Sequence, residues 1–154
     1  MKTRTFKITQ EGFDRFVAEL KELRTVKRPI IIARLQKARE MGDLSENSEY
    51  TSAKEAQRTI DSRIIWLEIR TRNAEIVEKS ENNDIVSLGS TVTLEKDGEK
   101  FIYEIVGELE ADIVQKKLST SSPIGRAMMG KKVGDCVSVV VPAGTIVYNL
   151  IKIQ

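Results

Sequence analysis

The segment MGDLSENSEY, residues 41–50, gathers three carboxylates in a chain that contains no histidine. Asp43, Glu46 and Glu49 are spaced three residues apart, directly after Gly42. At the start of a helix this spacing places Asp43 and Glu46 on one side, where their oxygens could bind a metal ion. Mg²⁺ prefers oxygen ligands but requires six of them in octahedral geometry. Two carboxylates are therefore an incomplete site, and another macromolecule would have to supply the remaining ligands.

The same acidic residues also have a purely structural interpretation. Carboxylates in a first helical turn complement the helix macrodipole, and Asp43 or Ser45 could simply be an N-cap. Gly42 suggests a sharp turn, and basic residues lie on both sides of the acidic segment. Both interpretations are open at this point.

Two helical patterns flank the acidic segment. Thr9 can cap a helix that begins near Gln10, and Pro29 predicts a kink or break near residues 28–29. The first apolar stripe comprises Phe13, Phe16, Leu20, Leu23, Ile31, Leu35 and Ala38. The second follows a heptad spacing through Tyr50, Ala53, Gln57, Ile60, Ile64, Leu67, Thr71 and Ala74. These stripes predict an antiparallel coiled-coil hairpin with the carboxylates at its turn.

Beyond the polar run KSENND the period changes from helical to alternating. Residues 91–95 and 101–106 flank Asp97-Gly98, a hairpin turn signal, and residues 136–141 and 146–153 flank a second turn. Between them, Ser122 as cap and Pro123 at the first position open a short helix that Gly130 ends. We predict an all-α domain over residues 1–78 and an α+β domain with a mostly antiparallel sheet over residues 79–154.

Composition indicates a folded protein of a reducing compartment. The chain has 154 residues, of which 40% are hydrophobic and 31% charged, and a single cysteine. No apolar run approaches the roughly 20 residues of a membrane span, and the first residues lack a signal-peptide core. Residues 1–79 carry 17 basic and 13 acidic residues (+4) and residues 80–154 carry 8 and 10 (−2). We expect a cytoplasmic protein whose first half tolerates a phosphate-bearing partner.

Several motifs resemble the Gre family of bacterial transcript-cleavage factors (GreA/GreB), and the sequence is closer to the GreA type. The similar segments are ITQEG (8–12), VKRP (26–29), AREMGDLSENSEY (38–50), TSAKEAQ (51–57) and SPIGRAMMGKKVGD (122–135). The resemblance implies a C-terminal domain of FKBP-like fold that docks at the rim of the secondary channel of RNA polymerase. It also implies that the coiled coil enters this channel as part of a monomeric factor.

The resemblance further implies a role for each candidate residue. Asp43 and Glu46 help to hold the second catalytic Mg²⁺ of the polymerase and orient the attacking water, while no cofactor is bound by the factor alone. The polymerase then cleaves the nascent RNA of a backtracked complex, so the factor is not itself an enzyme. Lys54 and Arg58 would contact the RNA 3′ end, with Arg34 and Lys37 as weaker candidates. The polymerase docking residues would be Ser121, Ser122 and Pro123.

Three alternative functions are open for this sequence. A relative of the same architecture could block the channel instead, and the chain could be a scaffold without chemistry. A prolyl isomerase would need an aromatic pocket, and residues 80–154 contain only Phe101, Tyr103 and Tyr148. Met128, Met129 and Cys136 are expected in the core. Trp66 lies off the heptad seam, either exposed or against the second domain.

Overall fold

The computed structural model describes residues 5–42, 47–80 and 83–154. Contacts divide the chain into two compact units, one containing Phe13–Asn73 and the other the described parts of Met1–Gly12 and Ala74–Gln154. Each unit is described separately below. The boundary between residues 78 and 79 stays a prediction.

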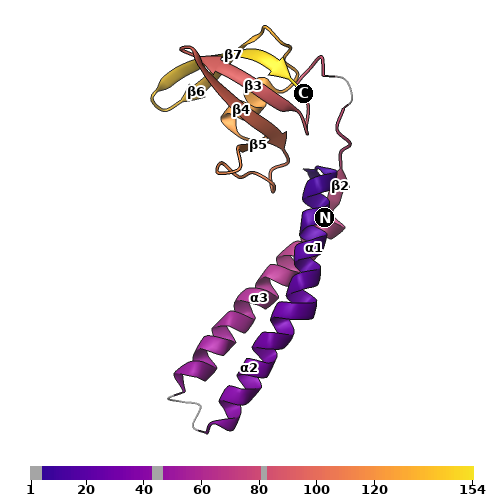
Figure 1. The fold of residues 1–154 in the computed structure, drawn as a ribbon, viewed down its shortest axis with the longest axis vertical. Coiled ribbons are helices and arrows are strands. Elements are labelled where there is room, and N and C mark those ends of the chain that lie inside the picture. Colours follow the sequence, from indigo (N-terminus) through magenta and orange to yellow (C-terminus); the bar gives the residue numbers. More distant parts are fainter. Residues whose placement is uncertain (1–4, 43–46, 81–82) are drawn as a thin grey trace. The chain divides into compact units, whose positions relative to one another are not determined.

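The helical unit is an antiparallel hairpin, as the two apolar stripes predicted. Its first arm comprises α1 (Gln10–Glu22), a π-helical turn η1 (Leu23–Lys27) and α2 (Arg28–Glu40), and the return arm is α3 (Ser48–Arg72). Thr9 caps α1 as expected, because its Oγ1 accepts a hydrogen bond from the backbone N–H of Gly12 at 3.0 Å. α2 and α3 lie side by side along their length (Figure 1). The 25 residues of α3 extend about 37 Å.

The irregularity expected at Pro29 is a π-helical turn rather than a break. The backbone N–H of Arg28 donates to Leu23 O, five residues earlier, and Pro29 lies in the first turn of α2. A π turn absorbs one additional residue into a helix. The step from Leu23 to Ile31 is eight residues where a heptad has seven, so η1 keeps the apolar stripe on one side. It also places Pro29 in the first turn of α2, where a backbone N–H would have no partner within the helix, so the missing N–H of proline costs little.

The seam of the hairpin is formed by the predicted stripes. The residues with less than a tenth of their surface exposed are Phe16, Leu23, Leu35, Ala38, Ala53, Ile64 and Leu67. Near the turn the seam consists of two alanines, Ala38 at 1% exposure and Ala53 at 0%. Small side chains at facing positions allow close helix approach, so the two arms are tightly packed below the acidic segment.

The second unit is built on a five-stranded sheet of order β5-β4-β3-β7-β6. The strands are β3 (Thr91–Lys96), β4 (Glu99–Val106), β5 (Lys117–Ser119), β6 (Cys136–Val141) and β7 (Gly144–Ile153), and α4 (Pro123–Met128) packs on β6. All pairings are antiparallel except β4 with β5. Asp97 and Gly98 have φ of 53° and 82°, as a tight hairpin turn requires. The predicted α+β class with a mostly antiparallel sheet is confirmed.

The core of this unit lies between α4 and one face of the sheet. Its buried side chains are Val86, Val92, Leu94, Ile105, Met128, Val137, Val139, Leu150 and Ile153. Met128 is in the core as predicted, but Met129 is 40% exposed. Cys136 is also exposed, contrary to expectation, because alternation places Val137 and Val139 inward.

Three short strands escaped the sequence analysis. β5 is one of them, and β1 (Phe6–Ile8) and β2 (Ala74–Ile76) form a separate two-stranded parallel sheet. Ala74 was predicted on the helical seam, but α3 ends at Arg72 and Ala74 pairs with Phe6. Strands of three residues have no readable period, and this pairing joins residues 68 positions apart in the sequence.

Trp66 belongs to the hairpin and not to the other unit. Its ring meets Phe16 edge to face at a centroid distance of 5.6 Å. The guanidinium groups of Arg63 and Arg70 each lie 4.5 Å from the Trp66 ring centroid. Trp66 is therefore a cation–π platform beside the seam. Among the described residues, no helix has the length and apolar character needed to cross a membrane.

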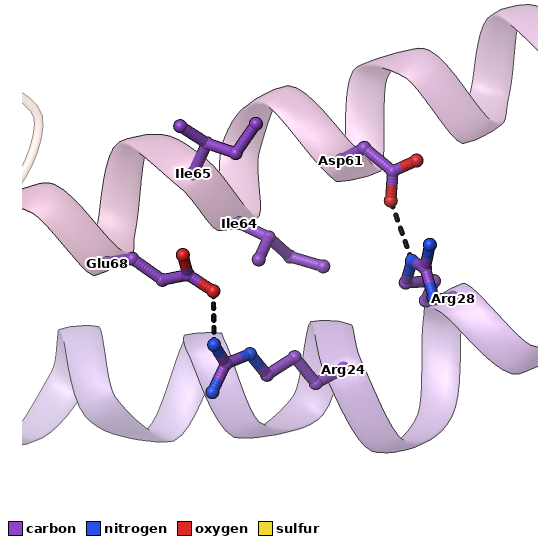
Figure 2. Close-up of a pocket in the computed structure, with 6 residues that line it drawn as sticks. All are labelled: Arg24, Arg28, Asp61, Ile64, Ile65 and Glu68. Carbon is purple, nitrogen blue, oxygen red and sulfur yellow. Dashed lines mark hydrogen bonds and ion pairs between the residues drawn. The ribbon is translucent and has the colours of Figure 1, made fainter.

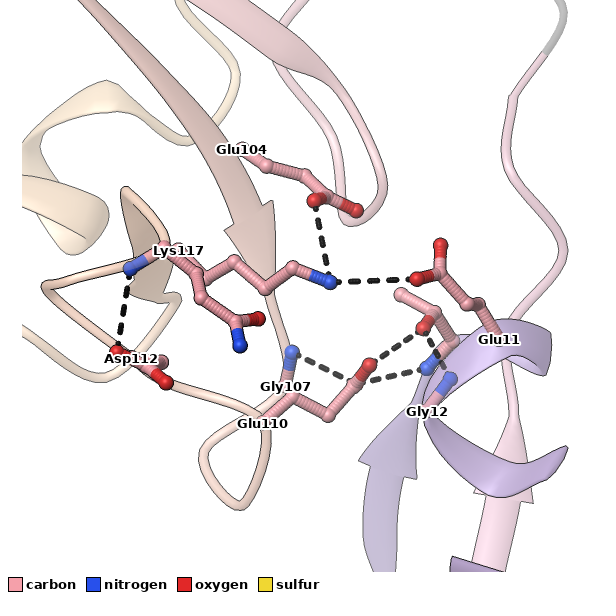
Figure 3. A network of polar contacts seen from close by, with 9 residues as sticks. Glu11, Gly12, Glu104, Gly107, Glu110, Asp112 and Lys117 are labelled. Carbon is pink, nitrogen blue, oxygen red and sulfur yellow. Dashed lines mark hydrogen bonds and ion pairs between the residues drawn. The ribbon is translucent and has the colours of Figure 1, made fainter. Parts of the chain in front are cut away.

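A buried carboxylate fixes the start of α1 (Figure 3). Glu110 is 2% exposed, and its Oε2 accepts hydrogen bonds from Thr9 N at 2.9 Å and Gly107 N at 3.1 Å. Its Oε1 accepts from the Thr9 hydroxyl. A Cβ on Gly12 would lie 2.0 Å from Glu110 Oε1, so only glycine fits there. Close by, Lys117 Nζ lies 3.4 Å from both Glu11 and Glu104.

Gly12→Ala is expected to destabilise the protein by about 1–3 kcal/mol, the usual cost of overpacking. The Glu110 carboxylate can make room only by giving up its hydrogen bonds. Helix propensity alone would predict the opposite effect, since alanine in a helix is more stable than glycine by about 0.5–1 kcal/mol. Urea unfolding followed by circular dichroism measures the free energy of unfolding.

The control is the same substitution in a Glu110→Ala background. With the carboxylate gone, Gly12→Ala should no longer destabilise, which a double-mutant cycle reports as a coupling between the two positions. Equal losses in both backgrounds would contradict the packing explanation.

Candidate functional site

The acidic segment lies between the ends of α2 and α3. Asp43 and Glu46 fall outside the described residues, so their predicted metal role stays a prediction. The flanking helix ends are described: α2 ends at Glu40 with Met41 as C-cap, and α3 begins at Ser48 with Asn47 as N-cap. The suggestion that Asp43 or Ser45 caps α3 is therefore wrong, because Asn47 Oδ1 accepts the N–H of Tyr50 at 3.0 Å.

Glu49, the third carboxylate of the segment, is engaged on the side of the hairpin. Its carboxylate forms a two-point ion pair with Arg34 of α2, in which Arg34 Nε and Nη2 both donate. The second of these bonds measures 3.0 Å. The hydrogen bond and charge of Arg34 lower the pKa of Glu49 below its usual value. Glu49 and Arg34 thus neutralise each other. Glu49 is therefore not grouped with Asp43 and Glu46 as a candidate metal ligand.

An aromatic residue of the first turn of α3 lies between two cations, one from the last turn of α2 and one from α3. Arg39 Cζ and Lys54 Nζ are each 5.8 Å from the centroid of the Tyr50 ring. A hydrogen bond from Arg39 is the main cause that lowers the pKa of the Tyr50 hydroxyl, and the charge of Lys54 adds to it. Lys54 and Arg58 are both exposed, one turn apart on the same helix. Cations therefore lie on both helices close in sequence to the acidic segment. The contact of Lys54 and Arg58 with RNA stays a prediction.

The predicted docking residues surround the start of α4. Ser122 is its N-cap: Ser122 Oγ accepts from Gly125 N at 3.0 Å and donates to Ser119 O at 2.7 Å. Ser121 Oγ lies 2.6 Å from Ser119 Oγ. Ser121 and Pro123 are exposed, whereas Ser122 is half-buried. The structural role expected of Ser122 and Pro123 is confirmed, and the role in docking stays a prediction.

Comparison with known proteins places these features in a family. Residues 6–76 match the family model "Transcription elongation factor, N-terminal" of GreA and GreB, and residues 81–154 match the corresponding C-terminal model. The chain belongs to the GreA/GreB family of transcription elongation factors. The resemblance inferred from GDLSENSEY and the SPIGRAMMG segment is thereby confirmed.

Relatives of this GreA/GreB-family chain match it along nearly its whole length. Transcription elongation factor GreA of Bacillus licheniformis is 46% identical over 154 residues, covering 98% of both chains. GreA of Lactococcus lactis subsp. lactis is also 46% identical, covering 98% of this chain and 99% of its own. Among solved structures, GreA factor homolog 1 (Gfh1) of Thermus thermophilus is 30% identical with a TM-score of 0.46, covering 98% and 99%.

A groove in the middle of the GreA/GreB-family hairpin belongs to the helix interface (Figure 2). It has a volume of about 410 Å³ and its apolar lining residues are Ile64 and Ile65. Its charged residues pair across the two arms, Arg28 with Asp61 at 2.7 Å and Arg24 with Glu68. Exposed pairs of this kind contribute at most about 1 kcal/mol each to stability. Because Arg24, Arg28, Asp61 and Glu68 are all paired, their charges balance within the groove and do not favour a charged ligand.

Sequence reasoning missed the polar residue that closes the turn of the hairpin. Asn47 Nδ2 donates to the carbonyl of Ala38 at 2.8 Å, in addition to capping α3. The signal was present, since asparagine is among the best N-caps and precedes the helical pattern SEYTSAKEAQ. Elsewhere, residues 5–42, 47–80 and 83–154 contain no cluster of three or more His, Cys, Asp or Glu side chains that could hold a metal ion.

Arg34→Gln is expected to raise the pKa of Glu49 back toward its usual value. Because the folded-state pKa is lowered, the pair stabilises the hairpin above the unfolded-state pKa of Glu49, and this stabilisation is lost as pH falls through the folded-state pKa. Carbon-detected NMR titration of the Glu49 carboxyl measures the shift.

The matched control is Arg63→Gln. Arg63 lowers the pKa of Glu19 by the same kind of two-point ion pair, with bonds of 2.7 and 2.8 Å. Its removal should raise the pKa of Glu19 and leave that of Glu49 unchanged. A Glu49 titration indifferent to Arg34→Gln would show that the ion pair does not form in solution.

Proposed function

We propose that this chain binds bacterial RNA polymerase in the cytoplasm and stimulates the polymerase to cleave the nascent RNA of backtracked complexes. In this proposal the factor is not a catalyst by itself. Its hairpin enters the secondary channel and brings Asp43 and Glu46 to the polymerase active centre. Its C-terminal unit docks at the channel rim through Ser121, Ser122 and Pro123. The family membership supports a role in elongation, and the hairpin supports delivery through a narrow passage.

One observation carries the proposal: the structure pairs Glu49 with Arg34 and caps α3 with Asn47. Neither structural task is left for Asp43 and Glu46, which are the remaining carboxylates of the acidic segment. Two carboxylates suit Mg²⁺ chemically but fill only part of its coordination shell. An ion held jointly with the polymerase resolves this shortage, so the factor alone would hold it weakly.

The residues of the chain then have separable tasks. Asp43 and Glu46 would hold the second Mg²⁺ and orient a water molecule toward the scissile phosphodiester. When bound, that ion supplies positive charge for the attacking and leaving oxygens, as in two-metal sites. Lys54 and Arg58 would attract the phosphates of the extruded RNA 3′ end. The pairing of Arg34 with Glu49 removes Arg34 from this set, and Lys37 is exposed beside it.

Asp43→Asn and Glu46→Gln are each expected to lower the maximal cleavage rate by about 10- to 100-fold, the range seen when a metal site is weakened. The amides keep the shape of the side chains but lose the charge that binds Mg²⁺. Affinity for the polymerase should be unchanged, because docking is assigned to other residues. The assay follows shortening of 3′-labelled RNA in a stalled, backtracked complex, with binding measured separately.

Glu49→Gln is the matched control and should keep the wild-type cleavage rate, since Glu49 is engaged by Arg34. If wild-type protein slows nucleotide addition without cleavage, the chain is a channel-blocking inhibitor instead. If Asp43→Asn stimulated cleavage at the wild-type rate, the assignment of Asp43 as a metal ligand would be wrong.

Variants of the docking segment are expected to show the reverse pattern. Ser121→Glu adds a charge at an exposed position and should raise the half-saturating factor concentration without changing the maximal cleavage rate. A lowered maximal rate at saturating factor would show that this segment acts in the chemistry or that the variant perturbs the fold. Circular dichroism of the variant distinguishes the last two cases.

A further inference from the structure

We propose that Asn47 is a positioning residue for the acidic segment, acting as a clamp that joins the end of α2 to the start of α3. The inference rests on the proposed function of Asp43 and Glu46, which precede Asn47 in the sequence. It follows from the two hydrogen bonds that one amide group makes.

Asn47 bonds simultaneously to both arms of the hairpin. Its Nδ2 donates to Ala38 O in the last turn of α2 at 2.8 Å, and its Oδ1 accepts from Tyr50 N in the first turn of α3 at 3.0 Å. The Asn47 carbonyl also accepts the N–H of Thr51 at 3.1 Å, which begins the hydrogen-bonding pattern of α3. One side chain thus gives the Ala38 carbonyl a second donor, beside the Met41 N–H at 3.3 Å, and satisfies an orphan N–H in the first turn of α3.

The surroundings make this clamp short and well defined. Ala38 of α2 and Ala53 of α3 are both almost fully buried, so the seam near Asn47 is made of small side chains, which favour close packing of the two helices. The Asn47 backbone is extended, with φ of −82° and ψ of 93°, as an N-cap requires. The last turn of α2 and the first turn of α3 are therefore bonded to the same side chain.

The identity of the side chain distinguishes a clamp from an ordinary cap. Serine, aspartate and asparagine are nearly interchangeable as N-caps, because each offers an oxygen to the helix N–H groups. Only asparagine adds an N–H₂ donor on a different atom from the capping oxygen, whereas aspartate would turn a second acceptor oxygen toward the Ala38 carbonyl oxygen, and two acceptors repel. If Asn47 were only a cap, Asn47→Ser and Asn47→Asp would be almost silent.

A loosened clamp should affect the rate rather than binding. Catalysis depends on geometry so strongly that a displacement of about 1 Å can lower a rate by about 100-fold. The proposed docking residues belong to the other unit, on α4 and the loop before it. We therefore expect Asn47→Ser and Asn47→Asp to lower the maximal cleavage rate by about 10- to 100-fold, with an unchanged half-saturating factor concentration and a greater Mg²⁺ requirement.

The cleavage experiment compares these two variants with Asp43→Asn and with Asn73→Ser on backtracked polymerase complexes. Asn73 is at the opposite end of α3, where only its backbone N–H bonds to the helix, so its variant controls for loss of an asparagine side chain. Serine replaces the amide N–H₂ with a hydroxyl that ends one atom closer to the backbone and adds no charge, whereas aspartate has no donor and adds charge, so a common defect reports the lost bond to Ala38. Circular dichroism should show α3 intact in both.

A second readout does not depend on cleavage. Spin labels at cysteines introduced for Met41 and Ser48, in a Cys136→Ser background, report the separation of the two helix ends by dipolar spectroscopy. Both positions are exposed. The wild-type turn should give a narrow distance distribution, which Asn47→Ser should broaden and Asn73→Ser should not.

The outcomes separate the two proposals. If Asp43→Asn abolishes stimulation while Asn47→Ser cleaves at the wild-type rate, the proposed function stands and the positioning role is overturned. A narrow distribution in Asn47→Ser likewise overturns the clamp. If the wild-type protein does not stimulate cleavage at all, the proposed function fails and the positioning role in that reaction falls with it.

Discussion

The close packing of α2 against α3 is the constraint on which the acidic turn depends. The seam changes from large side chains, such as Leu23 and Leu67, to two alanines at the turn, and all four are buried. Small side chains at the seam let two helices pack closely, here next to the point where the chain reverses. That approach brings the Ala38 carbonyl within reach of Asn47 and Arg34 within reach of Glu49. Without a tight seam, neither interaction could form across the arms.

Electrostatics then sorts the carboxylates of one short motif. Glu49 forms an ion pair with Arg34 across the two helices, whereas Asp43 and Glu46 precede Asn47, the N-cap of α3. Exposed ion pairs contribute little to stability, so the main effect of the pair between Arg34 and Glu49 is to neutralise the Glu49 carboxylate. Asp43 and Glu46 are therefore the carboxylates of the segment that remain as candidate metal ligands. The cations Arg39 and Lys54 remain close by, around Tyr50.

The start of α1 obeys a different constraint, the burial of a carboxylate. Glu110 is removed from water and must be compensated by hydrogen bonds, which Thr9 and Gly107 supply. Gly12 permits the approach because any Cβ would occupy the position of the carboxylate. The motif ITQEG thus gains a physical explanation: the threonine caps the helix and binds Glu110, and the glycine leaves room for it.

Local pattern was sufficient for the regular elements of this protein. The heptad seam, the Thr9 and Ser122 caps, the Asp97-Gly98 turn and the alternating strands could all be predicted from sequence, because each depends on neighbours within a few residues. The acidic motif likewise identified the family and the candidate metal ligands. What tertiary structure alone decided were contacts between distant residues: the pairing of β1 with β2, the burial of Glu110, and the placement of Trp66 against Phe16. The roles of Glu49 and Asn47 belong to this second class, because Arg34 and Ala38 become their neighbours only when the two helices pack.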